Sequence, residues 1–407
     1  MGENAFAAMR RAIDMRDASM WLPAMARIAN ERSAIEMAIN SGGDAYGFTS
    51  LLGPLDDLSA GEDYQDNLLR WHLIGRPSEI ATRCGDWISA VKLQQLSLGG
   101  SGITPATFSA LADRFAKGIC YKIDLDASYS SADVVPASWW VQSVFGDPCH
   151  LERQGDLIAL INGNFVSIGL IAYATERLIE DLCGILASLS AAGLKGYGAT
   201  ETQEAIVDML HLEHAGNDRP QRSVLSRDCI PMVTGILADV SQAIKVICTA
   251  LMHQSGNPLF RFDEDKVSAV SNSSFLDFSI SSAAMSLAHA TRLAARLLNK
   301  VISIVCTSAE ERSSRDPKWI QYPKVTLGYC IAIEGGQVGP MQLTGEESGG
   351  VEDLWDTGLI STNCLLRQLD ILDKELAVAF DCFGTAELDH IQRLTFSQLM
   401  ELCMLTQ

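Results

Sequence analysis

The stretch D-A-S-Y-S-S-A-D-V-V-P, residues 126–136, is the most informative segment of this 407-residue chain. At its centre lies the tripeptide Ser130-Ser131-Ala132, in which two hydroxyl-bearing residues precede a small apolar residue. Because a hydroxyl both donates and accepts hydrogen bonds, one interpretation is that the two serines line a polar pocket. The other segments of the chain indicate whether this stretch has a catalytic role.

Eight other segments stand out along the chain. They are DAYGFTSLLG at 44–53, NLLRWHLIG at 67–75, LGGSGITP at 98–105, LIALING at 157–163, CIP at 229–231, NPL at 257–259, SNSSF at 271–275 and VED at 351–353. Together with residues 126–136, they resemble, in the same order, the motifs of the histidine and phenylalanine ammonia-lyase family. Each motif alone is weak, but a collinear set over about three-quarters of the chain is specific.

Helical periodicity dominates the rest of the sequence. Leucines recur at steps of three and four residues between 365 and 376, which is typical of one helix face. We expect long helices at about 275–308 and 357–379, and a helix that begins at Pro105 with Thr104 as its N-cap. Residues 324–333 (KVTLGYCIAI) are the best strand candidate, although the family resemblance would make part of this run helical or irregular. Long apolar helices usually pack in a bundle or across a subunit interface.

Composition excludes several functional classes. A hydrophobic content of 47% is ample for a deep core, and a net charge of −19 argues against nucleic acid and anionic membranes as partners. The apolar region 157–194 is interrupted by Asn162, Gly163 and Asn164, which argues against a membrane span. The 11 scattered cysteines lack a C-x-x-C pair, so we expect free thiols, a cytoplasmic location and no metal site.

The resemblance implies a mainly all-α fold, with a central bundle of long helices and a smaller N-terminal active-site region. It implies one ammonia-lyase-like unit over residues 1–407. Residues 1–150 would hold the lid and the prosthetic-group loop, and residues 151–407 the long-helix bundle. Family members are homotetramers whose pockets combine loops from three subunits, so a homotetramer is implied as well.

The tripeptide at 130–132 differs from the sequence that forms the family's prosthetic group. In the family, Ala-Ser-Gly cyclises into methylidene-imidazolone (MIO), an electrophile, and Ser131 matches the serine of that ring. Ala132 stands where the family has glycine, and its Cβ opposes the compressed turn that ring closure needs. We therefore expect cyclisation to fail and no cofactor to be present, with an MIO group from Ser130-Ser131-Ala132 as the alternative.

Two further positions match catalytic residues of the family. Tyr46, followed by Gly47 in a lid-like segment, matches the tyrosine that removes a β-proton from the substrate. Its alternative is a packed lid tyrosine. Glu352 matches a pocket glutamate, and buried carboxyls of that kind can move protons. Its alternative is a solvated acid in the first turn of a helix.

Other positions match residues that hold the substrate. His72 matches a histidine that faces the substrate, with a hydrogen-bonded core histidine as its alternative. Asn162 matches an amide that holds the prosthetic group or substrate, with an Asn-Gly turn as its alternative. Phe275 matches a pocket phenylalanine, with a core aromatic at a helix start as its alternative. His211 and His214 have metal-like i, i+3 spacing, but nothing else supports a metal.

The segment before residues 229–231 departs from the family pattern. Leu225 stands at the position of a tyrosine, and Asp228 at that of the arginine that binds the substrate carboxylate as a bidentate ion pair. An aspartate would repel a free carboxylate, so a free α-amino acid is a poor substrate unless Arg222 or Arg227 compensates.

Three functions remain open at this stage. The first is a divergent family enzyme without MIO that uses acid–base residues for an elimination, isomerisation or cyclisation. Its substrate would be a small aromatic or carrier-protein-linked molecule of specialised metabolism. The second is an MIO-dependent aromatic amino acid ammonia-lyase or aminomutase. The third is a pseudoenzyme that serves as a binding scaffold. The matches at Tyr46, His72 and Asn162 favour the first over the third.

Overall fold

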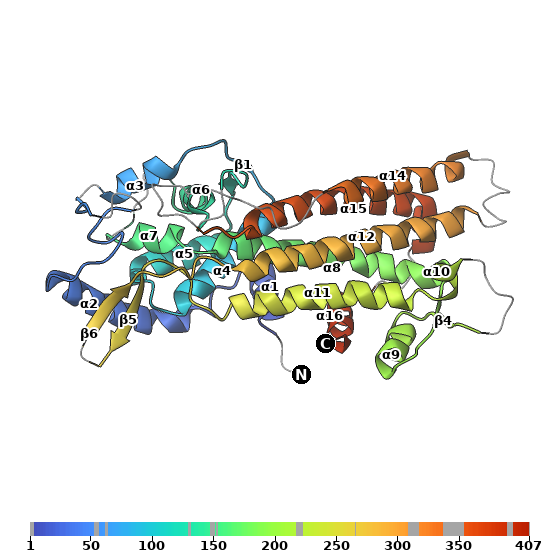
Figure 1. The fold of residues 1–407 in the computed structure, drawn as a ribbon, viewed down its shortest axis with the longest axis horizontal. Coiled ribbons are helices and arrows are strands. Elements are labelled where there is room, and N and C mark those ends of the chain that lie inside the picture. The colour runs from blue at the N-terminus through green and yellow to red at the C-terminus, as the bar shows by residue number, and fades with distance from the viewer. Residues whose placement is uncertain are drawn as a thin grey trace. The chain divides into compact units, whose positions relative to one another are not determined.

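The computed structural model describes residues 4–52, 57–61, 64–128, 132–146, 151, 154–216, 223–264, 266–307, 317–336, 354–388 and 394–406, without the side chains of 383–388. Helices make up most of these residues, and the described strands form three two-stranded pairs (Figure 1). The mainly α-helical fold predicted from the sequence is confirmed.

The chain divides into two compact units. Unit 1 consists of Met1–Tyr173, Val246–Ser282 and Pro340–Asn363, and unit 2 of Ala174–Lys245, Ala283–Gly339 and Cys364–Gln407. Four long helices have residues in both units: α8 (Phe165–Ala191), α11 (Ile230–Ala250), α12 (Phe278–Cys306) and α15 (Gly358–Leu388). The predicted single unit with regions 1–150 and 151–407 stays a prediction.

Unit 1 holds the elements that carry most predicted site residues. They are α1 (Ala5–Met15), η1 (Leu22–Ala24), α2 (Met25–Asn40), α3 (Tyr64–His72), β1 (Ser78–Glu79), α4 (Thr82–Ser97), α5 (Pro105–Lys117), β2 (Lys122–Ile123), α6 (Val134–Phe145), α7 (Asp156–Ile161), β5 (Leu259–Asp263) and β6 (Lys266–Val270). Strand β1 pairs with β2, and β5 forms an antiparallel hairpin with β6.

Helix α4 forms the centre of the unit 1 core, with 12 of its 16 residues buried. Helix α1 packs on it through the stacked rings of Phe6 and Trp87, whose centroids lie 5.1 Å apart. Gly85 is required on another face, because a Cβ there would lie 2.0 Å from the ring of Tyr121. This close packing fixes α4 beneath the candidate site.

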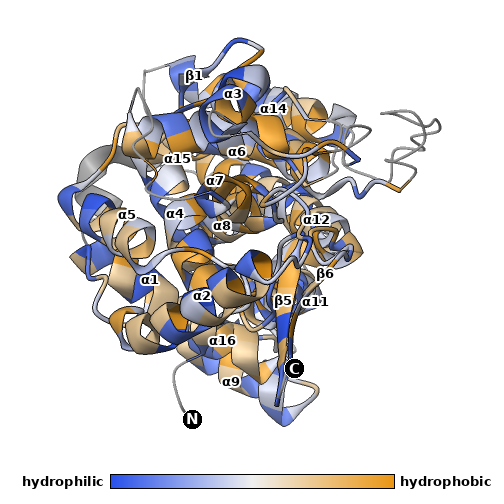
Figure 2. Cartoon of the chain, turned by 90° about the vertical axis from the view of Figure 1, so that its left-hand side faces the viewer, coloured by the Kyte–Doolittle hydropathy of each residue, from blue (hydrophilic) through white to orange (hydrophobic). Residues whose placement is uncertain are grey.

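Helix α7 is anchored at its N-terminus by a buried carboxylate. Asp156 accepts hydrogen bonds from the Thr104 backbone N–H at 2.7 Å and from the hydroxyls of Thr104 and Thr107 at 2.8 and 2.6 Å. Thr104 also caps α5, with Pro105 as the first helical residue, so the predicted helix start is confirmed. Helix α7 is coloured mostly hydrophobic in Figure 2, which agrees with its buried position.

Unit 2 contains shorter elements beside its parts of the long helices. They are β3 (Lys195–Gly196), α9 (Glu201–Met209), β4 (Glu213–His214), α10 (Val224–Arg227), η3 (Pro317–Ile320), α14 (Tyr322–Gly335) and α16 (Phe396–Leu405). Strands β3 and β4 are parallel.

The strand predicted at 324–333 is wrong, because these residues lie within helix α14. The β-branched residues of this run favour a strand locally, but tertiary contacts decide otherwise. Thr326 is fully buried, and its hydroxyl accepts a hydrogen bond from the Asn299 amide of α12 at 2.6 Å while donating to the Tyr322 carbonyl oxygen of its own helix at 3.1 Å.

The two long helices predicted from periodicity are confirmed, with shifted ends. Helix α12 runs from Phe278 to Cys306, and α15 from Gly358 to Leu388. Two described segments are long and apolar enough to span a membrane by composition, namely Asp156–Ala191 and Ile230–Ala250. In the first, 94% of the most apolar window is buried inside the chain, which is typical of a core helix.

Candidate active site

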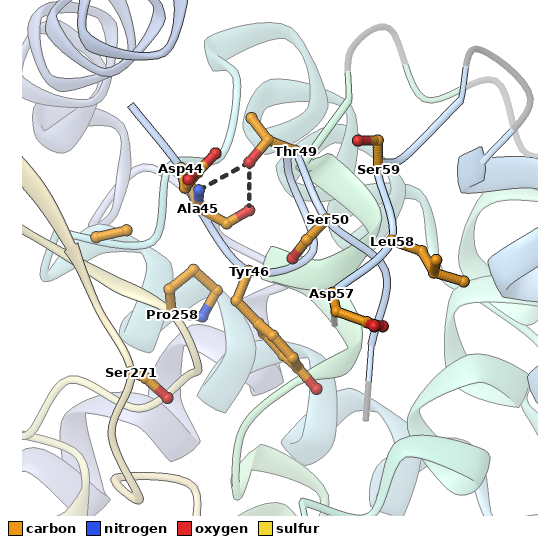
Figure 3. Close-up of a pocket in the computed structure, with 11 residues that line it drawn as sticks. Asp44, Ala45, Tyr46, Thr49, Ser50, Asp57, Leu58, Ser59, Pro258 and Ser271 are labelled. Carbon is orange, nitrogen blue, oxygen red and sulfur yellow. Dashed lines mark hydrogen bonds between the residues drawn. The ribbon is translucent and has the colours of Figure 1, made fainter. Parts of the chain in front are cut away.

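A cavity of about 470 Å³ lies beside the turn that carries Tyr46 in unit 1. The Tyr46 ring extends away from this turn and, in the view of Figure 3, lies between Pro258 on one side and Asp57 on the other. Among the lining residues that the structure describes, Asp44 and Asp57 are the only ones with a carboxylate, and none is a lysine or arginine. We refer to this space as the Tyr46 cavity.

Local contacts hold the turn in place. The Thr49 hydroxyl accepts a hydrogen bond from the Ala45 N–H at 2.9 Å and donates to the Ala45 carbonyl oxygen at 3.3 Å (Figure 3). Gly47 has φ +70° and lies so close to α7 that a Cβ would be 2.8 Å from Ile158. Glycine is required at that position for both reasons. The turn is therefore seated on α7 and not loosely placed.

Helix α3 carries His72 at its end and Tyr64 at its beginning. The His72 Nδ1 lies 2.8 Å from the Leu68 carbonyl oxygen. Since a carbonyl oxygen only accepts, Nδ1 must carry the proton, and Nε2 of a neutral ring is left as an acceptor. At the other end, the pKa of Tyr64 is raised by burial and by the charge of the nearby Tyr46 phenol.

Asn162 ends α7, where the chain turns into α8 through Gly163 at φ +142°. The Asn162 side chain is 7% exposed, and its Oδ1 is buried without a hydrogen-bond partner among the described residues. A free buried acceptor beside the predicted site is what a substrate-binding amide requires. The Asn-Gly turn is present as well, so the geometry is compatible with a substrate-binding amide and with a turn-forming residue.

A fully buried lysine lies behind Asn162. Lys92 Nζ donates a hydrogen bond to the Asn162 carbonyl oxygen at 3.3 Å and lies 4.5 Å from the centre of the Phe165 ring. Burial lowers the pKa of Lys92 from 10.5 to about 7. One turn along α4, the Gln95 amide donates to Asn164 Oδ1 at 2.8 Å. The turn between α7 and α8 is thus supported from α4 by two polar side chains.

The described end of the prosthetic-loop segment is held by a buried carboxylate. Asp133 accepts hydrogen bonds from the hydroxyls of Ser128 at 2.7 Å and Ser167 at 3.0 Å. Burial raises the pKa of Asp133, and these two hydrogen bonds oppose the rise. Ser167 also contacts the Asn164 carbonyl oxygen at 3.2 Å. These contacts connect the loop to the turn that presents Asn162.

Position 132 allows a test of whether the chain suits an MIO group. Ala132 has φ +58° and is 7% exposed. A left-handed backbone is the conformation that glycine adopts without strain, and it costs an L-residue about 1–2 kcal/mol. The backbone therefore has the shape that suits glycine, but the residue brings a methyl group into buried surroundings. Ser130 and Ser131 lie outside the described residues, and the expected absence of an MIO group stays a prediction.

Asp356 is a further buried carboxyl in unit 1, just before the start of α15. It accepts hydrogen bonds from the backbone N–H groups of Asp277 at 3.0 Å and Gly358 at 2.9 Å. Burial raises the pKa of Asp356 to about 7 despite these bonds, and the charge of Asp133 adds to the rise. A carboxyl that titrates near neutral pH can hold or release a proton.

Phe275 is half-buried in the turn between β6 and α12. It precedes the first residue of α12, Phe278, by three positions. Its neighbour Ser274 fixes the turn, because the Ser274 hydroxyl donates to the Gly256 carbonyl oxygen at 3.0 Å. The role of Phe275 as a pocket residue stays a prediction.

Leu225 and Asp228 belong to unit 2, on and just after α10. Asp228 Oδ1 accepts hydrogen bonds from the backbone N–H groups of Tyr197 at 3.2 Å and Ile230 at 3.1 Å. The aspartate at the position of the family's arginine therefore caps the start of α11. Leu225 is half-buried, and Arg227 is exposed at the end of α10. His214 is 59% exposed and 3.6 Å from Glu204.

Four sequence-predicted residues, Ser130, Ser131, Arg222 and Glu352, lie outside the described residues. In the described parts of the chain, no group of three or more potential ligand side chains could hold a metal ion.

Sequence reasoning did not single out four polar groups of unit 1: Tyr64, Lys92, Asp133 and Asp356. One signal was available for Lys92, because it follows a run (Trp87–Val91) in which only Ser89 is polar. A capping role for Asp356 could have been predicted, because it lies two residues before Gly358, the first residue of α15. Only tertiary structure shows that Tyr64 lies near Tyr46.

Comparisons with known proteins identify similar sequences and similar folds. The aromatic amino acid lyase family model matches residues 7–151. Histidine ammonia-lyase of Alkaliphilus metalliredigens is 25% identical over 292 residues, which cover 60% of this chain and 57% of that protein. The match thus spans little more than half the length of this curated relative.

Solved structures show the same fold. Phenylalanine aminomutase of Pantoea agglomerans aligns with a TM-score of 0.73 at 17% identity, over 99% of this chain and 92% of that one. Histidine ammonia-lyase of Trypanosoma cruzi aligns with a TM-score of 0.70 at 17% identity, over 94% and 82%. The predicted ammonia-lyase-like fold is confirmed. Together with the sequence matches, it makes the chain similar to the proteins of the histidine and phenylalanine ammonia-lyase superfamily.

Proposed function

We propose that this chain is a divergent enzyme of the superfamily that works by acid–base chemistry without an MIO group. Tyr46 is the base, and Glu352 and Ser131 are the groups that return or hold a proton. The reaction is an elimination, isomerisation or cyclisation of a small aromatic or carrier-protein-linked substrate. His72, Asn162 and Phe275 bind that substrate.

The charge of the Tyr46 cavity carries this proposal. The described lining contains Asp44 and Asp57 and lacks a lysine or arginine. A free α-carboxylate in the cavity would meet two like charges and no counter-ion among these residues, which is unfavourable. An ester, thioester or amide of the same acid removes that penalty, which is why a carrier-linked or otherwise uncharged substrate fits better.

The geometry suits proton transfer beside a bound carbonyl compound. Tyr46 lines the cavity, and the buried Oδ1 of Asn162, which has no hydrogen-bond partner among the described residues, is the acceptor that we assign to an N–H or O–H of the substrate. A tyrosine acts as a base only when its surroundings favour the phenolate. Most residues of helix α7, which the turn of Tyr46 contacts at Ile158, are buried.

Position 132 supports the absence of MIO, because it keeps a glycine-like φ of +58° with an alanine side chain. Intact mass of the purified chain tests this directly. We expect the mass of the unmodified sequence. A mass lower by two water molecules would overturn this part of the proposal.

Activity is tested with aromatic amino acids, supplied as free acids and as thioesters or amides, by following the absorbance of a conjugated product. We expect turnover only of the uncharged forms, and its loss in Tyr46→Phe. Tyr197→Phe is the matched control, since Tyr197 lies in unit 2 and is 59% exposed. Turnover of free acids alone, or full activity of Tyr46→Phe, would contradict the proposal.

The alternative is an MIO-dependent aromatic amino acid ammonia-lyase or aminomutase. Its support is the similarity to proteins described as a phenylalanine aminomutase and histidine ammonia-lyases. It predicts the loss of two water molecules in the intact mass and turnover of free amino acids.

We further propose a cytoplasmic homotetramer with a role in specialised metabolism. Helix α14 supports self-association, because Leu327 and Ile331 are 52% and 63% exposed and lie one turn apart. Light scattering on the purified protein measures the assembly. We expect Ile331→Glu to reduce it and Lys324→Glu, on the same helix, to reduce it less.

A further inference from the structure

The side chain of Lys92 joins the two ends of the turn between α7 and α8. Its Nζ donates a hydrogen bond at 3.3 Å to the carbonyl oxygen of Asn162, the residue that ends α7. The same Nζ lies 4.5 Å from the ring centre of Phe165, the first residue of α8. All three residues belong to unit 1, and Lys92 is fully buried, so bulk solvent does not compete for these contacts.

The other side-chain hydrogen bonds to this turn hold Asn164 and not Asn162. The Gln95 amide donates to Asn164 Oδ1 at 2.8 Å, and the Asn164 N–H donates to Ser255 Oγ at 3.1 Å. Among the described residues, Lys92 is the only one whose side chain forms a hydrogen bond with Asn162. The position of Asn162 therefore depends on Lys92 more than on any other described side chain.

The amide oxygen of Asn162 is left without a partner while the backbone of the same residue is fully paired. Its N–H donates to the Ile158 carbonyl oxygen at 3.0 Å, and its carbonyl oxygen accepts from Lys92. These two bonds fix the peptide planes on either side of its Cα, and the direction of the side chain follows from them. A buried acceptor that has no partner costs free energy, so its presence requires an explanation.

Helix α7 fixes Asn162 relative to the turn of Tyr46. The Ile158 carbonyl oxygen accepts from the Asn162 N–H, and the Ile158 side chain lies against Gly47, where a Cβ would be 2.8 Å away. One residue of α7 thus contacts both segments. A shift of Asn162 would change its place relative to Tyr46.

We propose that Lys92 is a positioning residue, which fixes the backbone of Asn162 so that the amide oxygen of Asn162 can accept a hydrogen bond from the substrate. The proposal rests on the proposed role of Asn162 in substrate binding. Methionine has a similar length and no donor, so Lys92→Met leaves the Asn162 carbonyl oxygen without its partner. The variant should be more stable, because a buried charge is removed, and yet bind substrate more weakly, because the acceptor is displaced.

Hydrogen exchange followed by mass spectrometry tests this contact in the free protein. We expect the peptide that covers residues 160–166 to exchange about fivefold faster in Lys92→Met, because the turn opens with one hydrogen bond fewer to break. Helix α5 should exchange no faster than in the wild type. Lys324→Met is the matched control, since it removes an exposed lysine from α14. Unchanged or slower exchange of residues 160–166 in Lys92→Met would overturn the inference.

Binding of L-phenylalaninamide, measured by calorimetry, tests the consequence for the substrate. This probe has no free carboxylate and offers N–H donors to Asn162 Oδ1. We expect its Kd to rise about tenfold in Lys92→Met and by about as much in Asn162→Ala. Because Lys92 acts through Asn162, the double variant should bind no more weakly than Asn162→Ala alone. A purely structural role of Lys92 predicts instead that the two effects multiply, and that result would refute the proposal, as would an unchanged Kd in Lys92→Met.

The outcomes separate this inference from the proposed function. If Asn162→Ala weakens binding and Lys92→Met does not, the proposed function stands and only the role of Lys92 is wrong. If Asn162→Ala leaves the Kd unchanged, the proposed role of Asn162 fails, and the role of Lys92 in binding fails with it, even where exchange of the turn is faster. If the wild type does not bind L-phenylalaninamide, an aromatic amide is not its substrate, and the role of Lys92 in recognising one is wrong as well.

Discussion

Replacing Lys92 with methionine should stabilise the folded chain at neutral pH and abolish a specific pH dependence. Lys92 is fully buried, and its described hydrogen bond, to the Asn162 carbonyl oxygen, is 3.3 Å long. An ammonium group loses its hydration on burial, and one hydrogen bond and a ring face do not replace it. Methionine has a similar length and carries no charge.

The magnitude follows from the pKa. Burial lowers the pKa of Lys92 from 10.5 to about 7, and one unit corresponds to about 1.4 kcal/mol. At pH 7 the folded state is therefore destabilised by about 4 kcal/mol relative to a lysine that titrates normally. Loss of the hydrogen bond costs about 1 kcal/mol. We expect Lys92→Met to raise the free energy of unfolding by about 3 kcal/mol at pH 7.

The sign of the pH dependence is fixed by the direction of the shift. Because the pKa of Lys92 is lower in the folded chain, the unfolded chain binds the proton more tightly between pH 7 and 10.5. Stability of the wild type therefore rises with pH across this window. From pH 7 to 9.5 the wild type should gain about 3 kcal/mol relative to Lys92→Met.

Urea denaturation at pH 7 and 9.5, followed by circular dichroism, measures both quantities. The comparison between variants cancels the contributions of other titrating groups. Lys324→Met is the matched control, since it removes the same charge from an exposed position. Parallel pH profiles for the wild type and Lys92→Met would refute the reasoning, because they would show that the folded chain holds Lys92 with an ordinary pKa.

Three other changes have clear expected outcomes. Ala132→Gly should raise the free energy of unfolding by about 1 kcal/mol in urea denaturation, because φ is +58° at this position; a loss of stability would contradict the strain. Asp228→Ala should lower it by about 1 kcal/mol and Asp228→Asn by less, since only an oxygen-bearing side chain can accept from Ile230 N–H. The sulfurs of Cys306 and Cys382 lie 3.3 Å apart, so oxidation with diamide should form a disulfide between them and give a faster-migrating band on a non-reducing gel. Replacing either cysteine with serine should remove this band. If the band remains in the serine variant, another pair of cysteines forms the cross-link.

Local signals in the sequence were sufficient wherever the cause is local. The start of α5 depends on a hydroxyl cap and a proline within two residues, and both act through the backbone beside them. The long helices α12 and α15 follow from apolar periodicity over many turns. Residues 324–333 form a helix despite their local preference for a strand, because tertiary contacts stabilise the helical form. One such contact is the hydrogen bond between Thr326 and Asn299.

The candidate site shows the same division. Tyr46 was predicted as a site residue from the family resemblance of segment 44–53, and it lines a cavity in the structure. The contacts of Tyr64, Lys92 and Asp356 join segments that are far apart in the chain, and no spacing along the sequence encodes them. The capping role of Asp228 was missed for another reason: its position was compared with an arginine and not with the helix that begins two residues later.

The altered loop is best understood from what still holds it. Ala132 keeps the backbone conformation of a glycine at a cost of about 1 kcal/mol, so something in the fold requires that shape. Asp133 supplies the reason, because its buried carboxylate binds both Ser128 of the loop and Ser167 of α8. Asp133 thus ties the described end of this segment to α8, and the absence of an electrophile stays a prediction that the intact mass tests.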